Sequence, residues 1–235
     1  MSQEMMNVDQ LALFLHRDAR EVQRWASRGY LPSHKVSGEY RFHPAEINHW
    51  VETQMHAYTE QELTNLEQGT AGRGQDQQPL LTTIMSETTM AVPLQASTKA
   101  SVLRELVKVA EQSWQVYDAA AILEAIRQRE ELGSTALESG VAIPHPRRPM
   151  PNALGEHVVA FARLVNPIPF GAPHGGLTDL FFLVCCQDDR THLRTLARLS
   201  RLMLRPGFPS DLRSAETPAA AFAVIEAAEQ DLLPQ

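Results

Sequence analysis

The sequence predicts an α/β sandwich preceded by a small helix-turn-helix module, and three observations support this fold class. Apolar, strand-like runs alternate with amphipathic helices after about residue 80, which is typical of a sheet covered by helices. Two short helices separated by a brief polar turn lie within the first 30 residues. A stretch rich in Gly and Gln separates the two parts. We therefore expect a helix-turn-helix domain over residues 1–54, a flexible linker over 55–79 and an α/β domain over 80–235.

The bulk composition is that of a globular protein with room for two domains. The chain has 235 residues and a net charge of −7, which argues against a nonspecific binder of polyanions. No apolar run approaches the roughly 20 residues of a membrane span, and the N-terminus lacks a signal-peptide pattern. The two cysteines, Cys185 and Cys186, are adjacent, which suits neither a disulfide framework nor a zinc site. We expect a cytoplasmic protein without membrane insertion.

The first module begins with two short helices. Residues 8–15 form an apolar run that predicts the first helix. Asp18 is placed to cap a second helix over residues 19–27, and Gly29 is placed to end it in a left-handed conformation. Two helices across so brief a turn indicate a helix-turn-helix.

A hairpin and a third helix complete the predicted module. Residues 35–42 alternate as in a hairpin, with the bend at Ser37 and Gly38. His43 and Pro44 then open a helix that extends to about residue 53, because Pro is favoured in the first turn of a helix.

This order of elements resembles the excisionase/MerR-like family of winged-helix DNA-binding domains. The matching motifs are Val-Gln-Arg-Trp at residues 22–25, Gly-Tyr-Leu-Pro at 29–32 and Tyr-Arg-Phe at 40–42. The resemblance implies that the second helix enters the major groove of double-stranded DNA and that the hairpin lies along a flanking backbone. Because one such module offers few contacts, we expect a homodimer on an operator with two half-sites.

The side chains of the second helix fit this role. Three arginines recur four residues apart and share one face of the helix, with Val22 and Trp25 directed toward the core. Gln23 is expected to be exposed and able to contact a base edge, while the wing supplies phosphate contacts. The expected DNA contacts are Arg17, Arg20, Gln23, Arg24, Arg28, Lys35 and Arg41. The alternative is an ordinary solvated helix face, with the acidic Glu21 beside it.

The segment between the two parts is expected to be a tether. Residues 61–68 could extend a helix, but residues 69–79 have no apolar periodicity. A flexible tether keeps two modules close without fixing their geometry. Any coupling between them must then come from a contact that the sequence does not reveal.

The C-terminal part shows the alternation of an α/β domain. Ser97 and Asp118 are placed to cap two helices, the second of which ends at Gly133. The run at 180–186 is apolar on both faces and predicts a central, covered strand. The other expected elements are a strand at 158–165, a helix from about Thr191 with a buried stripe, and a final helix over 219–230.

One histidine has an unusual setting in this part of the chain. His145 lies between Pro144 and Pro146, after a short strand-like run at 141–143 and before two arginines. Proline restricts its own backbone and that of the preceding residue, so the imidazole is held on a stiff loop. A neutral imidazole attacks phosphorus well near neutral pH. The alternative is a histidine in a Pro-rich turn with solvated arginines.

Two segments, Arg-Glu-Glu-Leu-Gly-Ser-Thr at 129–135 and Gly-Val-Ala-Ile-Pro-His at 140–145, closely resemble the active-site segment of a known family. The family is the fructose/mannitol/nitrogen-type enzyme IIA domains of the bacterial phosphoenolpyruvate-dependent phosphotransferase system (PTS). A second motif is Thr-His-Leu at 191–193, and the resemblance runs from about residue 80 to the C-terminus. It implies a mixed sheet with helices on both faces. Pro146 departs from the family, which usually has a small or basic residue after the histidine.

The resemblance also implies roles for individual side chains. His145 would accept the phosphoryl group on Nε2, Arg129 would hold phosphate oxygens, and His192 would be the second histidine at the head of a helix. Ser134 and Thr135 either donate hydroxyl hydrogen bonds or build the turn. The candidate phosphoryl-transfer residues are therefore His145, His192, Arg129, Ser134 and Thr135.

Taken together, these patterns indicate a PTS-regulated DNA-binding protein that acts as a phosphoryl carrier with a phosphohistidine intermediate. The expected partners are a phosphorylated, HPr-like histidine carrier protein, double-stranded DNA and other regulatory or transport proteins. The resulting change of charge would alter DNA binding and transcription regulation. The alternatives are a nitrogen-type regulator or a sugar-PTS carrier that acts through protein–protein contacts without DNA binding. No cofactor or metal site is expected, because the spacing of the remaining histidines suggests no metal cage.

Overall fold

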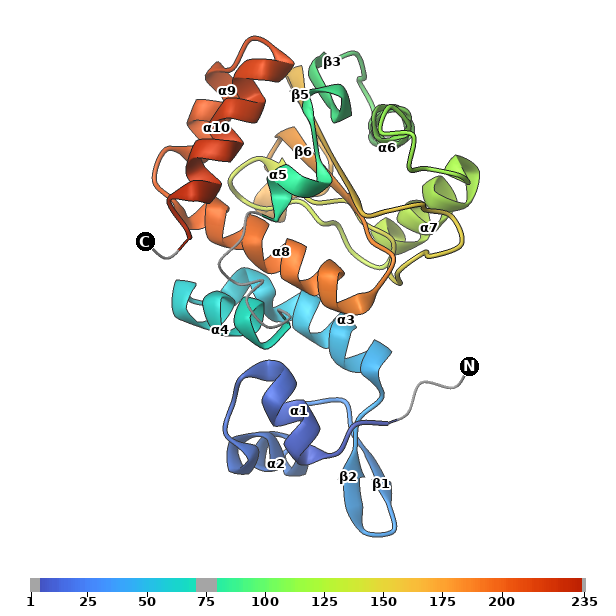
Figure 1. Cartoon of the computed structure of the whole chain (residues 1–235), viewed down its shortest axis with the longest axis vertical. Helices are drawn as coiled ribbons and strands as arrows, with labels where there is room; N and C mark the ends of the chain where they lie inside the picture. The colour runs from blue at the N-terminus through green and yellow to red at the C-terminus, as the bar shows by residue number, and fades with distance from the viewer. Residues whose placement is uncertain (1–4, 71–79, 234–235) are drawn as a thin grey trace.

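The structure, a computed structural model, describes residues 5–70 and 80–233 and has a small helical part below a larger α/β part (Figure 1). The N-terminal part contains two strands, β1 (His34–Val36) and β2 (Glu39–Arg41), and the helices α1 (Val8–Leu15), α2 (Ala19–Ser27), α3 (Pro44–Gln54) and α4 (Glu60–Thr70). The predicted order of two helices, a hairpin and a third helix is confirmed.

Local hydrogen bonds explain where the first two helices begin. Asn7 and Gln10 form a reciprocal capping box at the start of α1. The Asp18 side chain accepts a hydrogen bond from the backbone of Arg20 at 2.8 Å, as the sequence predicts. Gly29, with φ of +71°, follows the end of α2 in the left-handed conformation expected of it.

The hairpin turns at the two residues that the sequence indicates. Ser37 has φ of +52° and Gly38 φ of +86°, as in the tight turns whose twist matches that of the flanking strands. Tyr40 pairs with Lys35 across the hairpin. Pro44 then occupies the first turn of α3.

The C-terminal part is built on a four-stranded mixed sheet with the order β3-β5-β6-β4. Its strands are β3 (Met90–Leu94), β4 (Val141–Ala142), β5 (Val158–Ile168) and β6 (Thr178–Cys185). The outer strands β3 and β4 run parallel to their neighbours, whereas β5 and β6 are antiparallel. The mixed sheet implied by the resemblance is therefore present.

Helices cover both faces of this sheet, because β6 buries alternate side chains on opposite sides. Phe182 and Val184 pack with the helices α8 and α10, and Phe181 and Leu183 pack with α6 and α7. The helices of this part are α5 (Leu81–Ile84), α6 (Lys99–Glu111), α7 (Ala119–Glu131), α8 (Asp189–Leu204), α9 (Phe208–Ser214) and α10 (Pro218–Gln230). Within the described ranges, none of the helices combines the length and apolar character needed to span a membrane.

Some elements differ from the sequence-based expectation. Thr98, rather than Ser97, caps α6, and its side chain accepts from the backbone of Ser101. The strand β3 was not predicted, because it is short and contains Pro93. Its place at the edge of the sheet accommodates the missing proline N–H.

The largest difference is in the expected linker over 55–79. Residues 60–70 form α4, which lies against α8, and residues 71–79 are outside the described part of the chain. Leu63 and Leu66 of α4 are buried in a hydrophobic cluster that joins the core of the N-terminal helices to the α8 face of the sheet. The two parts are thus packed together in this structure, so residues 60–70 are not a free tether.

A buried ionic network fixes α4 to the α/β part. Arg198 of α8 is fully buried, and its guanidinium donates to Glu67 of α4 and, at 2.8 Å, to Glu229 of α10. Arg201 donates to the other oxygen of Glu67 at 2.7 Å. Glu229 also accepts hydrogen bonds from the backbone at the start of α5, including that of Leu81 at 2.8 Å. Charges buried in this way are stable only as a group, because each compensates the desolvation of another.

We predict that Arg198→Met lowers the free energy of unfolding by about 3–5 kcal/mol, because it leaves two carboxylates buried without their shared partner. Denaturant unfolding of the full chain measures this loss. The matched control is Arg104→Met, since Arg104 pairs with Glu105 on the surface and such pairs contribute about 0–1 kcal/mol. Equal stability of the two variants would contradict the importance of the network.

Candidate functional site: two histidines and a carboxylate between the two parts

His145 is held by the strand and loop that the sequence indicates. Val141 in β4 pairs with Leu180 in β6, and beyond the strand the backbone N–H of Val184 donates to Pro144 O at 3.0 Å. The Nδ1 atom of His145 lies 2.7 Å from Ile143 O. Because a carbonyl only accepts, Nδ1 carries the proton in this bond. In the neutral ring Nε2 therefore presents a lone pair to the site.

His192 approaches from the first turn of α8. Asp188 caps this helix and accepts a hydrogen bond from the backbone N–H of Thr191 at 2.8 Å. The rings of His145 and His192 lie edge to face, with 5.2 Å between their centroids. The structure thus brings together the two histidines that the motifs single out.

Arg129 reaches the same place from the last turn of α7. It is buried, and its Nη1 donates to Gly133 O at 3.0 Å, which holds the turn after the helix. Thr135 hydrogen-bonds to the buried Glu130 through its backbone and its hydroxyl. Ser134 donates its hydroxyl to Phe170 O at 3.1 Å. Both hydroxyls are therefore committed to the turn, which favours the second of the two alternatives for these residues.

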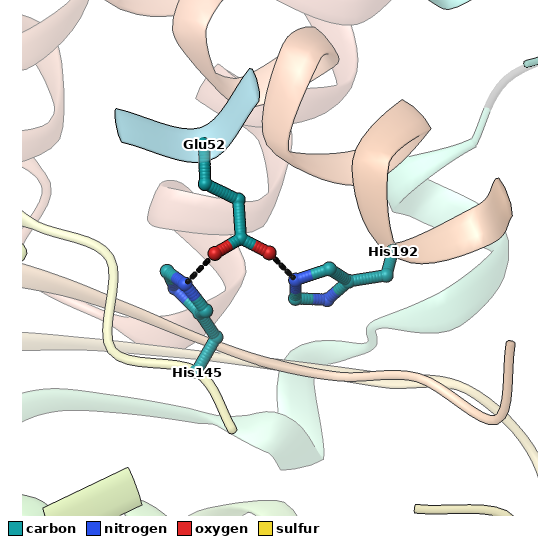
Figure 2. Close-up of side chains that lie close together, drawn as sticks. All are labelled: Glu52, His145 and His192. Atoms are coloured by element: carbon teal, nitrogen blue, oxygen red, sulfur yellow. Dashed lines mark hydrogen bonds and ion pairs between the residues drawn. The ribbon is translucent and has the colours of Figure 1, made fainter. Parts of the chain in front are cut away.

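Glu52 is the site residue that sequence reasoning missed. It belongs to α3 of the N-terminal part, and its side chain is only 2% exposed. Figure 2 shows its carboxylate between the rings of His145 and His192. Its Oε1 lies 3.0 Å from His192 Nε2, and its Oε2 lies 3.5 Å from His145 Nε2. The Arg129 Nε is 4.0 Å from the same Oε2. We call these interactions of Glu52 with His145, His192 and Arg129 the Glu52 contact.

The electrostatics of the site follow from burial and from these neighbours. Burial raises the pKa of Glu52, but the imidazoles of His145 and His192 lower it by more, so its pKa lies well below the usual range. Burial lowers the pKa of His145 below 6.5, although the nearby Glu52 opposes this effect. At neutral pH the site therefore holds an ionised carboxylate beside a neutral His145.

Four buried atoms converge here without a hydrogen-bond partner: His145 Nε2, Glu52 Oε2, Arg129 Nε and His49 Nδ1, which lies 3.8 Å from the same Oε2. Buried polar atoms are normally satisfied, so this point of the structure is suited to a further group. The ligand atoms of Glu52, His145 and His192 lie within 4.8 Å of one another, and two imidazoles with a carboxylate are a donor set that zinc accepts. A metal ion would have to replace the hydrogen bond between His192 and Glu52, and the expectation of no metal site is not tested by this geometry.

The face of α2 predicted to contact DNA is exposed. Val22 is buried and Trp25 is half-buried, whereas the side chains on the opposite side face solvent. The exposed residues of this face are Arg20, Gln23, Arg24 and Arg28. Figure 1 shows α2 and the hairpin at the end of the molecule away from the sheet. The packing of α3 and α4 on the α/β part therefore leaves this face uncovered.

The other predicted DNA contacts have partners within the protein. Arg17 donates to Glu62 of α4 at 2.6 Å and lies over the Trp25 ring. It connects two helices, so we leave it out of the candidate DNA surface. Arg41 pairs with Glu39 at 2.8 Å. Lys35 is exposed on the hairpin, over the ring of Tyr40.

Comparisons with known proteins agree with this division. Residues 83–228 match the family described as "Phosphoenolpyruvate-dependent sugar phosphotransferase system, EIIA 2", and residues 5–55 match a helix-turn-helix domain family. A nitrogen regulatory protein of Bradyrhizobium diazoefficiens is 34% identical over 148 residues, which is 62% of this chain and 94% of that protein. The fructose-specific EIIABC component of Bacillus subtilis is 28% identical over 62% of this chain but only 23% of its own length.

Solved structures show the same fold for the C-terminal part. The nitrogen regulatory protein IIA-Ntr of Neisseria meningitidis has a TM-score of 0.55 at 24% identity and covers 61% of this chain and 97% of its own. The mannitol IIA structure from Escherichia coli has a TM-score of 0.53 at 16% identity, with 60% and 97% covered. The family match spans more than half of the sequence. This chain therefore belongs to the EIIA 2 family of the phosphoenolpyruvate-dependent sugar phosphotransferase system, with a helix-turn-helix domain ahead of the EIIA 2 domain.

Proposed function

We propose that the protein is a PTS phosphoryl carrier that accepts a phosphoryl group on His145 and couples this event to DNA binding by the helix-turn-helix domain. The observation that carries the proposal is the convergence of an imidazole lone pair with a second imidazole and a guanidinium. Phosphoryl transfer asks the protein mainly for an in-line approach and for positive groups around the phosphoryl oxygens. Arg129 and His192 supply donors of this kind beside His145 Nε2.

The transfer step follows from the tautomer of His145. The Nε2 lone pair forms the new N–P bond while the N–P bond of the donor phosphohistidine breaks. The donor nitrogen keeps the electron pair of that bond, and its ring, protonated on the other nitrogen, leaves as neutral imidazole. His145 retains its Nδ1 proton, so its phosphorylated ring is cationic. The hydrogen bond from Nδ1 to Ile143 O becomes charge-assisted and stabilises the product.

The partners follow from the two domains. A phosphorylated, HPr-like histidine carrier protein is the proposed donor, and double-stranded DNA is the proposed ligand of α2 and the hairpin. One of the structurally similar proteins is a IIA mannitol enzyme solved as a complex with phosphorylated IIB mannitol, which shows that IIA domains of this fold dock onto partner proteins. We place the protein in the cytoplasm. As a homodimer it would present two copies of α2 to the two half-sites of an operator.

A second function is favoured by the match to nitrogen regulatory proteins. In this alternative the protein acts through contacts with other regulatory proteins, and the helix-turn-helix domain serves as a docking piece. The exposed arginines of α2 favour the DNA-binding version, because a docking piece has no need of an exposed basic face. Sequence-specific retardation of DNA distinguishes the two.

Incubation with phosphoenolpyruvate and the general PTS components is expected to place an acid-labile, alkali-stable label on the protein. The reason is that phosphorus bound to imidazole nitrogen has this stability pattern, unlike a phosphate ester. His145→Ala should remove the label completely. His157→Ala is the matched control, since His157 lies outside the site and bonds to the Gln187 backbone. Label that persists in His145→Ala would overturn the assignment of the acceptor.

The protonation of His145 is a second expectation. Burial lowers its pKa, so at pH 7 the ring should be neutral, with the proton on Nδ1 and none on Nε2. Nitrogen NMR of histidine-labelled protein reports both nitrogens directly. In urea the same residue should titrate near the unperturbed pKa of about 6.5. A doubly protonated His145 ring at pH 7 in the folded protein would contradict its role as a nucleophile.

DNA binding is expected to depend on the exposed face of α2. Arg24→Ala combined with Arg28→Ala should weaken binding to a specific fragment on the order of a hundredfold or more, because each base or phosphate contact of this kind contributes about 1–3 kcal/mol. Fluorescence anisotropy at fixed salt concentration measures the loss. Arg127→Ala, on the exposed face of α7, is the control. Unchanged binding by the double variant would show that α2 does not face the groove.

A further inference from the structure

The carboxylate of Glu52 lies in front of the nitrogen that the proposed function assigns to phosphoryl transfer (Figure 2). We infer that Glu52 is an internal occupant of the phosphoryl site, so that docking of the helix-turn-helix domain on this site and a phosphoryl group on His145 exclude one another. The inference rests on the proposed function. It names the means by which the two domains communicate.

The exclusion follows from space and charge. Glu52 Oε2 lies 3.5 Å from His145 Nε2, and a phosphoryl group bonded to that nitrogen must occupy the same space. Both groups are anionic, and the surroundings are buried, so their repulsion is not screened as it would be in water. The phosphoryl group and the Glu52 carboxylate would also compete for the same hydrogen-bond donors, because like charges placed together disfavour one another.

The groups around Glu52 are those that a phosphoryl group needs. His192 Nε2 lies within hydrogen-bond distance of Oε1, and Arg129 Nε lies 4.0 Å from Oε2. A carboxylate presents two oxygens to these donors in the way that a phosphoryl group presents its equatorial oxygens. Glu52 therefore acts as a chemical stand-in for the phosphoryl group, supplied by the other domain.

Access to the site leads to the same conclusion. His145 is 4% exposed and His192 is 2% exposed. A donor protein must bring its own phosphohistidine in line with Nε2, which it cannot do while α3 covers the site. The domain must undock before transfer, so the observed rate is reduced by the fraction of molecules that are docked.

The coupling acts in both directions. Once His145 is phosphorylated, the phosphoryl oxygens take the contacts of His192 and Arg129, and Glu52 cannot return. The helix-turn-helix domain stays undocked until the phosphoryl group leaves. By reciprocity, any ligand that prefers the undocked domain makes His145 easier to phosphorylate, and a ligand that prefers the docked domain protects it.

The first test is the initial rate of phosphorylation of the full chain at limiting donor. Glu52→Ala should accept the label on the order of tenfold faster than the native protein, because it shifts the population toward the undocked state. Glu52→Gln, which keeps the shape but not the charge, should be faster as well. The matched control is Glu46→Ala, since Glu46 lies on the same helix, is exposed and pairs with His34. Its rate should equal the native rate.

The second test measures docking itself, by the distance between two spin labels. Ser27→Cys on α2 and Gln112→Cys after α6 place the labels on exposed positions of the two parts. Burial raises the pKa of the native Cys185 and Cys186 thiols, so they react slowly with the label. Phosphorylation should replace one narrow distance distribution by a longer, broader one. Glu52→Ala should show this change without phosphorylation.

The outcomes separate this inference from the proposed function. Equal phosphorylation rates for the native protein, Glu52→Ala and Glu52→Gln, together with an unchanged label distance on phosphorylation, would overturn the inference and leave the phosphoryl carrier standing. Failure of every variant to accept label at His145 would overturn the proposed function, and this inference with it.

Discussion

The stability of one buried carboxylate between two imidazoles is the constraint on which the arrangement of this protein depends. An ionised carboxyl group is costly to bury unless charged or hydrogen-bonding partners surround it. Glu52 finds a hydrogen-bonding partner in His192 and a nearby positive charge in Arg129, which belong to the other part of the chain, as does the adjacent His145. The chemistry of the proposed phosphotransfer site and the position of the helix-turn-helix domain therefore depend on the same few atoms.

The helix α8 connects this contact to the rest of the fold. Its first turn presents His192 to the site, and two turns further on Arg198 holds Glu67 of α4. Leu63 and Leu66 of α4 continue the hydrophobic core from the first domain to the sheet. The interface between α4 and α8 is therefore largely apolar, with an ionic contact in its centre. A change at the N-terminal end of α8 acts on this interface. Such interfaces favour distinct packed and separated states over a gradual displacement.

The sequence indicates features that depend on neighbouring residues and misses contacts between residues that are far apart in the chain. Asp18, Gly29 and the Ser37–Gly38 turn are governed by neighbouring backbone groups, so their roles are visible in the sequence and are confirmed. His145 and His192 stand in recognisable motifs, and the structure brings them together. Glu52 is separated from His192 by 140 residues and lies in the last turn of an ordinary helix, so nothing near it in sequence indicates a partner. For α4, the apolar Leu63 and Leu66 outweigh the polar composition that predicted a tether.

The geometry of the docked state restricts the ways in which phosphorylation of His145 could alter DNA binding. Because α2 and the hairpin remain uncovered while Glu52 is docked, the proposed switch would not work by shielding α2 from DNA (Figure 1). Docking instead fixes the orientation of α2 relative to the larger α/β part. A dimer that binds two half-sites must place its reading helices about 34–36 Å apart. In such a proposed dimer, docked helix-turn-helix domains would be held at a fixed orientation to their α/β parts, whereas released domains would be free to adapt to the operator. In the proposed function, release of Glu52 would change DNA affinity through the freedom of the two helix-turn-helix domains to reorient, and the direction of that change would depend on how well the docked spacing matches the operator.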